Sequence, residues 1–209
     1  MLKSAIIFLL VGSCFCGLID RGQDVLDAAK LPLLTGFFRI EVNIDRLDTQ
    51  GKSHTGLPCD VLDRCDPKIK AFIDTEKPNN DFGGDSVPYD NYIVLHESNN
   101  APNVVPIGKT ISRDVCGKSI RKVAIRVRAI DKDGINDDKI DNYKCNISGE
   151  RNPVADDERS SQWSPEIACD GEDRPSSKVF LKYRWYRIPE QTCRPSSNGQ
   201  KLLSGLFSK

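Results

Sequence analysis

Residues 122–130 alternate apolar and mostly basic side chains, and this pattern constrains the fold more than any other part of the chain. The two rows are Val123, Ile125, Val127 and Ala129 against Lys122, Arg126 and Arg128. A period of two residues is that of a β-strand with one face buried and one face in water. The segment therefore predicts a half-buried strand.

Similar alternation recurs at residues 38–44, 68–74, 92–95 and 178–188. The segments between them are rich in Asn, Asp, Gly, Pro and Ser and favour loops, namely 77–88, 99–108, 149–164 and 169–177. No segment keeps a helical period over three or more turns. Short strands with long connections are typical of an antiparallel β-sandwich, so we expect an all-β fold.

The composition supports a single domain that acts by binding. The chain has 209 residues and 38% hydrophobic content, which is enough for one core. Its 30 basic and 30 acidic residues cancel, so we expect no nucleic-acid partner, and we expect a monomer. It contains no phosphate-binding loop, nucleophile elbow or metalloprotease motif, and its two histidines lie in polar segments. We therefore expect no enzymatic activity.

The N-terminus predicts a secretory signal peptide over residues 1–16. A lysine at position 3 precedes an apolar run at 5–11 and a small-residue stretch, which places cleavage after Cys16. The run is too short to span a bilayer, which needs roughly 20 residues. A buried N-terminal element and a lipoprotein signal around Cys14 are the alternatives. We expect a secreted protein with an arm or short helix at 17–34, a main domain at 35–193 and a tail at 194–209.

Eight cysteines occur, and six remain after the predicted signal is removed: Cys59, Cys65, Cys116, Cys145, Cys169 and Cys193. An even number in an exported chain favours disulfides, because the compartment is oxidising. We expect Cys59–Cys65, Cys116–Cys145 and Cys169–Cys193, although sequence alone leaves the pairing open. A zinc site is disfavoured, because no C-x-x-C pair exists. Asn146 begins an Asn-Ile-Ser sequon and predicts a surface glycosylation site.

Acidic residues lie where two of the predicted strands begin or end. Asp63 and Asp66 precede the strand at 68–74, and Asp131, Asp133 and Asp138 follow the strand at 122–130. Calcium takes six to eight oxygen ligands, which carboxylates on two neighbouring loops can supply. Alternatively, these carboxylates only shape turns by accepting hydrogen bonds from backbone amides. The sequence leaves both interpretations open.

Apolar residues in the same two loops predict a contact surface. Leu57, Leu62 and Ile135 can project from the loops and enter a lipid headgroup layer, or they can pack beneath the loops. Basic strand residues offer a second contact with anionic lipid: Arg126, Arg128, Lys182 and Arg184. The alternative is that these side chains form an ordinary solvated face.

The two acidic segments resemble loops one and three of a C2 domain, a β-sandwich that binds calcium and membranes through one rim. Asp66 begins an Asp-Pro-x-x-Lys motif, and Asp131 and Asp133 match the acids that follow the sixth strand of that fold. The resemblance implies that Asp66 and Asp131 meet at one rim, joined by Asp48, Asp60 or Asp63 from the earlier loop. Lys139 stands at the third acidic position of loop three, where an ammonium would lower cation affinity.

The landmarks between residues 36 and 193 also resemble the N-terminal domain of Notch ligands, the Delta, Serrate and Jagged family. They include Phe-Phe-Arg-Ile-Glu at 37–41, Trp-Ser at 163–164 and Phe-Leu-Lys-Tyr-Arg-Trp-Tyr-Arg at 180–187. The family's double cysteine is single here at Cys59, and Ile73 replaces another of its cysteines. Since no further cysteine follows Cys193 in this sequence, we expect a protein without the receptor-binding module and EGF repeats that normally follow in the family.

The resemblance implies a module that binds membrane phospholipid, a cell-surface receptor of the Notch type, or both, with calcium as a possible cofactor. The alternative is a secreted, disulfide-stapled sandwich that acts through a protein partner alone. Such a protein would serve as a co-ligand or antagonist in the Notch pathway and would need no calcium.

Overall fold

The computed structural model describes residue 31 and residues 33–59, 64–133, 137–195 and 201–203. These residues form nine strands, β1 (Phe37–Asp48), β2 (Pro67–Asp74), β3 (Ile93–Glu97), β4 (Val104–Cys116), β5 (Val123–Asp131), β6 (Asp138–Ile147), β7 (Ile167–Asp170), β8 (Lys178–Arg187) and β9 (Lys201–Leu203). Two short 3-10 helices, η1 (Tyr89–Asn91) and η2 (Glu190–Thr192), complete the described elements. The predicted signal peptide at 1–16 and most of the predicted arm lie outside the described residues.

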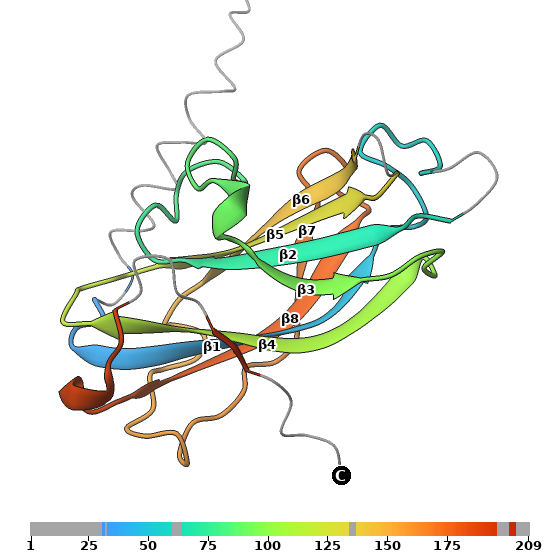
Figure 1. Cartoon of the computed structure of the whole chain (residues 1–209). Helices are drawn as coiled ribbons and strands as arrows, with labels where there is room; N and C mark the ends of the chain where they lie inside the picture. The colour runs from blue at the N-terminus through green and yellow to red at the C-terminus, as the bar shows by residue number, and fades with distance from the viewer. Residues whose placement is uncertain (1–30, 32, 60–63, 134–136, 196–200, 204–209) are drawn as a thin grey trace, which may run out of the picture. The chain divides into compact units, whose positions relative to one another are not determined.

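The strands form two antiparallel sheets (Figure 1). One has five strands in the order β7-β8-β1-β4-β9, and the other has four in the order β3-β2-β5-β6. The predicted all-β antiparallel sandwich is confirmed, and each of the five predicted strands is present. No helix in the described part of the chain is long and apolar enough to cross a membrane.

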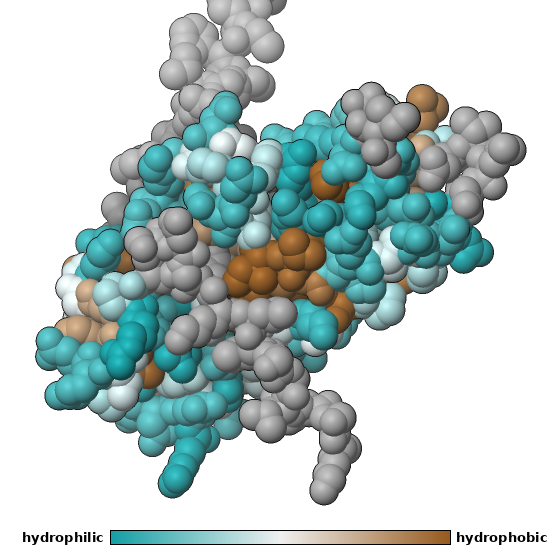
Figure 2. Space-filling model, in the orientation of Figure 1, coloured by the Kyte–Doolittle hydropathy of each residue, from teal (hydrophilic) through white to brown (hydrophobic). Residues whose placement is uncertain are grey.

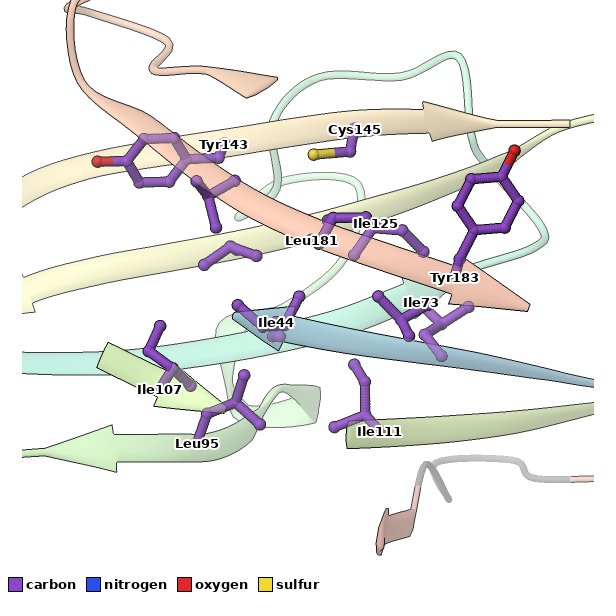
Figure 3. Packing of buried hydrophobic residues seen from close by; sticks show 14 of the residues in the cluster. Ile44, Ile73, Leu95, Ile107, Ile111, Ile125, Tyr143, Cys145, Leu181 and Tyr183 are labelled. Atoms are coloured by element: carbon purple, nitrogen blue, oxygen red, sulfur yellow. The ribbon is translucent and has the colours of Figure 1, made fainter. Parts of the chain in front are cut away.

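The core lies between the two sheets, where the inward rows of both meet. Figure 3 shows Ile44 and Leu181 of one sheet near Ile73 and Ile125 of the other, and all four are fully buried. Each such side chain contributes about 1.5–3 kcal/mol when it leaves water. Burial of the inward side chains of the alternating strands therefore supplies most of the free energy that stabilises the sandwich.

Four of the nine described strands were not predicted, namely β4, β6, β7 and β9. The two longer ones, β4 and β6, do not alternate cleanly in sequence. The segment around Pro106 and Gly108 in β4 reads as a loop, yet it pairs with β1 across a bulge between Ile44 and Arg46. In β6, a bulge between Ala129 and Ile130 of the partner strand shifts the register. A bulge moves the inward row by one residue, which hides the period of two.

The disulfide prediction was right for one pair and wrong for two. Cys59 joins Cys65 as expected, whereas the other bonds are Cys116–Cys193 and Cys145–Cys169. The reason is the strand order: β6 and β7 run side by side at the edge where the sheets meet, and Tyr143 forms a bridge with Gly171 there. The Cys145–Cys169 bond therefore connects the two sheets.

Both ends of the predicted main domain extend further than expected. Leu34, the last residue of the predicted arm, exchanges backbone hydrogen bonds of 2.8 and 2.9 Å with Ile120. Within the predicted tail, β9 pairs with β4, where Leu203 lies opposite Thr110. These segments therefore belong to the sandwich.

Candidate functional site

Four connections gather at one end of the sandwich, at the right of Figure 1. Their described residues are 49–59 and 64–66, 98–103, 132–133 with 137, and 171–177, and we call this end the rim. Backbone hydrogen bonds join its described parts: Thr49 donates to Asn103, and Ala101 donates to Cys65, both at 2.9 Å. The guanidinium of Arg174 donates to the Thr49 carbonyl at 2.7 Å. The rim is therefore one connected structure built from both sheets.

Asp66 and Asp131 come together at the rim although 65 residues separate them. β2 and β5 pair so that Pro67 lies opposite Asp131. The Asp66 backbone N–H donates to Oδ1 of Asp131 at 2.5 Å, and the Lys132 N–H donates to the Asp66 carbonyl at 3.1 Å. The geometry implied by the C2 resemblance is therefore present at this point.

The side-chain carboxylates of Asp66 and Asp131 accept hydrogen bonds that stabilise turns in the rim. Asp131 is fully buried, and Oδ1 of Asp66 accepts a hydrogen bond from the Asn100 N–H at 2.6 Å. An aspartate that satisfies backbone amides in this way fixes a loop. Both side chains thus hold three segments of the rim in place.

The described acids do not fit a calcium ligand set. Asp133 is exposed, and Asp138 lies opposite Asp131 in the β5–β6 register but is exposed as well. No group of three or more His, Cys, Asp or Glu side chains within the described ranges could hold a metal ion. Asp63 lies outside those ranges. Calcium needs six to eight oxygen ligands, which the described acids of the rim do not supply.

Lys139 takes a role that sequence reasoning did not anticipate. Its ammonium forms ion pairs with Glu172 at 2.8 Å and Asp173 at 2.6 Å, in the connection between β7 and β8. Partial burial lowers the pKa of Lys139, but the hydrogen bonds to Asp173 and Glu172 outweigh it and raise the pKa overall. The lysine therefore ties β6 to the other sheet.

Sequence reasoning also missed Asp141, a buried acid that shapes the same connection. Its carboxylate accepts hydrogen bonds from the backbone N–H groups of Asn142, Asp173 and Arg174 at 2.9–3.1 Å. Burial raises the pKa of this carboxyl despite those bonds. The available signal was an Asp-Asn pair in a segment that otherwise offers inward apolar residues, Ile140 and Tyr143.

Leu57 is the apolar residue that the rim exposes most clearly. Its side chain is 66% exposed, and its loop is fastened by a hydrogen bond from the Ser53 N–H to the Leu57 carbonyl at 2.8 Å. His54 of the same loop contacts the Lys139 carbonyl through its N–H at 3.1 Å. Lys52 of the same loop is exposed and forms a β-bridge with Pro58. Leu62 and Ile135, the other predicted contact residues, lie outside the described part of the chain.

The prediction that basic strand residues form an exposed face is wrong for Arg126. Arg126 is fully buried and pairs with Asp74 at 2.9 Å. Arg128 lies over the Tyr89 ring at 3.7 Å, and Arg184 pairs with Glu41. Connections between strands cover these positions, which strand periodicity cannot reveal. Of the four residues, Lys182 is exposed.

Asn146 is exposed on β6. Ser148, the third residue of its sequon, is buried and only 9% exposed. The surface position predicted for the asparagine agrees with the structure. Glycosylation itself stays a prediction.

The segment at 180–187 that resembles Notch ligands forms most of β8. Its inward residues, Leu181, Tyr183 and Trp185, are buried in the core. Core residues are selected for packing, so this part of the likeness does not mark a receptor-binding surface. The Notch-ligand type therefore stays a prediction.

Two antiparallel sheets packed face to face, with long connections gathered at one end, define the class as a β-sandwich with a loop rim. A solved C2 domain protein from Ramazzottius varieornatus is 79% identical over 81% of this chain and 99% of that chain, with a TM-score of 0.78. The chain therefore belongs to the C2 domain family.

More distant structures share less. Human GIVD cytosolic phospholipase A2 is 8% identical over 74% of this chain and 17% of that chain, with a TM-score of 0.48. Another C2 domain structure is 15% identical over 72% of this chain and 99% of that chain, with a TM-score of 0.41. No family model matches the chain, and no curated protein shows significant similarity to it.

Proposed function

We propose that this protein is a secreted, non-enzymatic C2 module whose rim binds anionic phospholipid surfaces without calcium. The observation that carries the proposal is Leu57, which is 66% exposed on a fastened loop. The exposed Lys52 belongs to the same loop and forms a β-bridge with Pro58, the residue after Leu57. An apolar tip next to a cation suits the headgroup layer, where the leucine leaves water and the lysine meets anionic lipid. The hydrogen bonds of Asp66 and Asp131 support the absence of a calcium requirement.

The expected affinity of the described contacts is modest. Burying one leucine contributes about 1.5–3 kcal/mol, and one lysine near an anionic surface adds about 1 kcal/mol. A total of about 3–4 kcal/mol corresponds to a dissociation constant of about 1 mM or weaker. Binding is therefore reversible and depends on surface density.

Sedimentation with phosphatidylserine–phosphatidylcholine vesicles tests the proposal, with calcium or with a chelator. We expect equal retention in both conditions and about tenfold weaker binding for Leu57→Ser. Val94→Ser is the matched control, because Val94 is 42% exposed on β3 and lies outside the rim. Figure 2 shows that an apolar area also lies near the middle of the face in view. Retention that is absent in both conditions, or unaffected by Leu57→Ser, would contradict lipid binding at the rim.

The same experiment separates the other parts of the proposal. Retention that needs calcium would contradict the calcium-independent mode, and hydrolysed lipid in the sedimented fraction would contradict the non-enzymatic role. Binding to cells that display a Notch-type receptor, with no binding to vesicles, would favour the protein-partner alternative. Secretion is tested by mass spectrometry of the protein released from expressing cells, where cleavage after Cys16 is expected.

A further inference from the structure

The connection at residues 75–92 folds back over the outer face of the four-stranded sheet. In Figure 1 this segment carries η1 and lies above β2. Three contacts hold it: Arg126 donates to the Lys77 carbonyl at 2.9 Å, Lys144 donates to the Asn80 carbonyl at 2.7 Å, and Asn142 donates to the Tyr89 hydroxyl at 3.2 Å. We call this segment the β2–β3 cover.

A pocket of about 350 Å³ lies between the cover, the end of β2 and Arg113 of β4. This volume is within the range of sites for small ligands. β2 begins at Pro67 beside the rim and ends at Asp74 beside the pocket. Eight extended residues span about 25 Å, so the pocket is remote from the rim.

One wall of the pocket is apolar. Val87 and Pro88 of the cover face Phe72 of β2 among the lining residues. The Phe72 ring stacks on Tyr92 with 5.5 Å between ring centroids, so its position is fixed by packing. These groups can bury the apolar body of a ligand.

The acids of the pocket are already occupied. Oδ1 of Asp74 accepts hydrogen bonds from the Glu76 and Lys77 N–H groups, both at 2.9 Å. Oδ2 accepts two from Arg126 at 3.1 and 2.9 Å. Glu76 is 58% exposed and pairs with Lys118 at 3.2 Å. Asp74 therefore offers no acceptor to a cationic ligand.

Two of the remaining polar residues, Arg113 and Lys77, are cations whose side chains only donate hydrogen bonds. The Arg113 side chain is only 11% exposed, lies 5.4 Å from the Phe72 ring centroid, and donates from Nη1 to the Ile73 carbonyl at 2.7 Å. Its Nη2 forms an ion pair with Glu76 at 3.6 Å, a distance too long for a good hydrogen bond. A guanidinium carries five N–H donors, so several are available. Lys77 and Asn91 line the same pocket.

We propose that the pocket binds a small organic carboxylate with an apolar body. The carboxylate accepts hydrogen bonds from Arg113, and the body lies against Phe72 and Val87. A buried guanidinium recognises a carboxylate by paired, charge-assisted hydrogen bonds. This inference is independent of lipid binding at the rim.

Titration with phenylacetate, followed by NMR of ¹⁵N-labelled protein, tests the proposal. We expect saturable shifts in the amides of Phe72, Val87 and Arg113, and no comparable response to phenethylamine or acetate. Arg113→Gln should weaken binding about tenfold or more, because it removes the charge that pairs with the ligand. Arg46→Gln is the matched control, since Arg46 forms a surface pair with Glu166.

Nuclear Overhauser contacts between phenylacetate and the wild-type protein make the test independent of how Arg113→Gln folds. Contacts from the phenyl ring to Phe72 and Val87 are expected. The proposal is overturned by contacts elsewhere, by no saturation, by an equal response to phenethylamine, or by unchanged affinity in a folded Arg113→Gln protein.

Discussion

Asp74 and Arg126 form a buried ion pair, in which Oδ2 of the aspartate lies 2.9 Å from Nη2 of the arginine. Their side chains are 2% and 0% exposed. The pair lies beneath the β2–β3 cover, and Arg126 also donates to the carbonyls of Lys77 and Asp81. Arg126 of β5 thus holds in place the β2–β3 cover, which lines the pocket.

Removing one member of this pair should be costly. We expect Asp74→Ala to lower the free energy of unfolding by about 3–5 kcal/mol, because it leaves an uncompensated buried charge. Urea unfolding measures the change. Glu166→Gln, which breaks the more exposed pair with Arg46, should cost less than about 1 kcal/mol. Equal losses for the two variants would show that Arg126 is not buried as described.

Gly171 should tolerate no larger residue. A Cβ at this position would lie 2.2 Å from Oδ2 of Asp141 and 2.7 Å from the Arg174 carbonyl, so the connection must shift. We expect Gly171→Ala to destabilise the protein by about 1–3 kcal/mol in thermal or urea unfolding. Gly56→Ala is the control, because its φ is +83° but no atom lies within 4 Å. A smaller loss at Gly171 than at Gly56 would contradict the close approach.

Peptide mapping of the unreduced protein should recover Cys116 linked to Cys193 and Cys145 linked to Cys169. Replacing both Cys145 and Cys169 by alanine should cost about 3 kcal/mol of stability, because the bond closes a loop of 24 residues. Recovery of a Cys116–Cys145 peptide would contradict the strand order at the β6–β7 edge.

His96 should make stability depend on pH. Burial, and then the nearby charge of Lys109, lower the pKa of His96 below its ordinary value of 6.5. The unfolded chain therefore takes up this proton first as the pH falls, so the folded state loses stability between 6.5 and the lowered pKa. Unfolding experiments on the wild type and on His96→Gln measure this effect. As the pH falls, the free energy of unfolding should decrease more for the wild type than for the variant. A pH-independent difference would refute the assignment.

Regular alternation was enough to predict two of the strands that border the rim. β2 and β5 show it clearly, and their pairing brings Asp66 to Asp131. Alternation failed at β4 and β6, because register shifts and the residues around Gly108 disguise the inward rows. Sequence alternation predicts a strand well where that strand pairs with its neighbours in a regular register.

The environment of a strand's outer face could not be predicted in the same way. Arg126 reads as a solvent-facing residue, yet the β2–β3 cover buries it. Likewise, the partner of Cys145 depends on which strand lies beside β6. Both facts depend on how distant segments meet, and periodicity carries no information about that.

The hydrogen bond between Asp66 and Asp131 bears on how the protein would be regulated. An aspartate side chain and a backbone amide already shape the rim. If the rim binds lipid as proposed, the module would therefore be constitutively competent rather than triggered by an ion. Its activity would then be set by the amount of protein present and by the surfaces it meets.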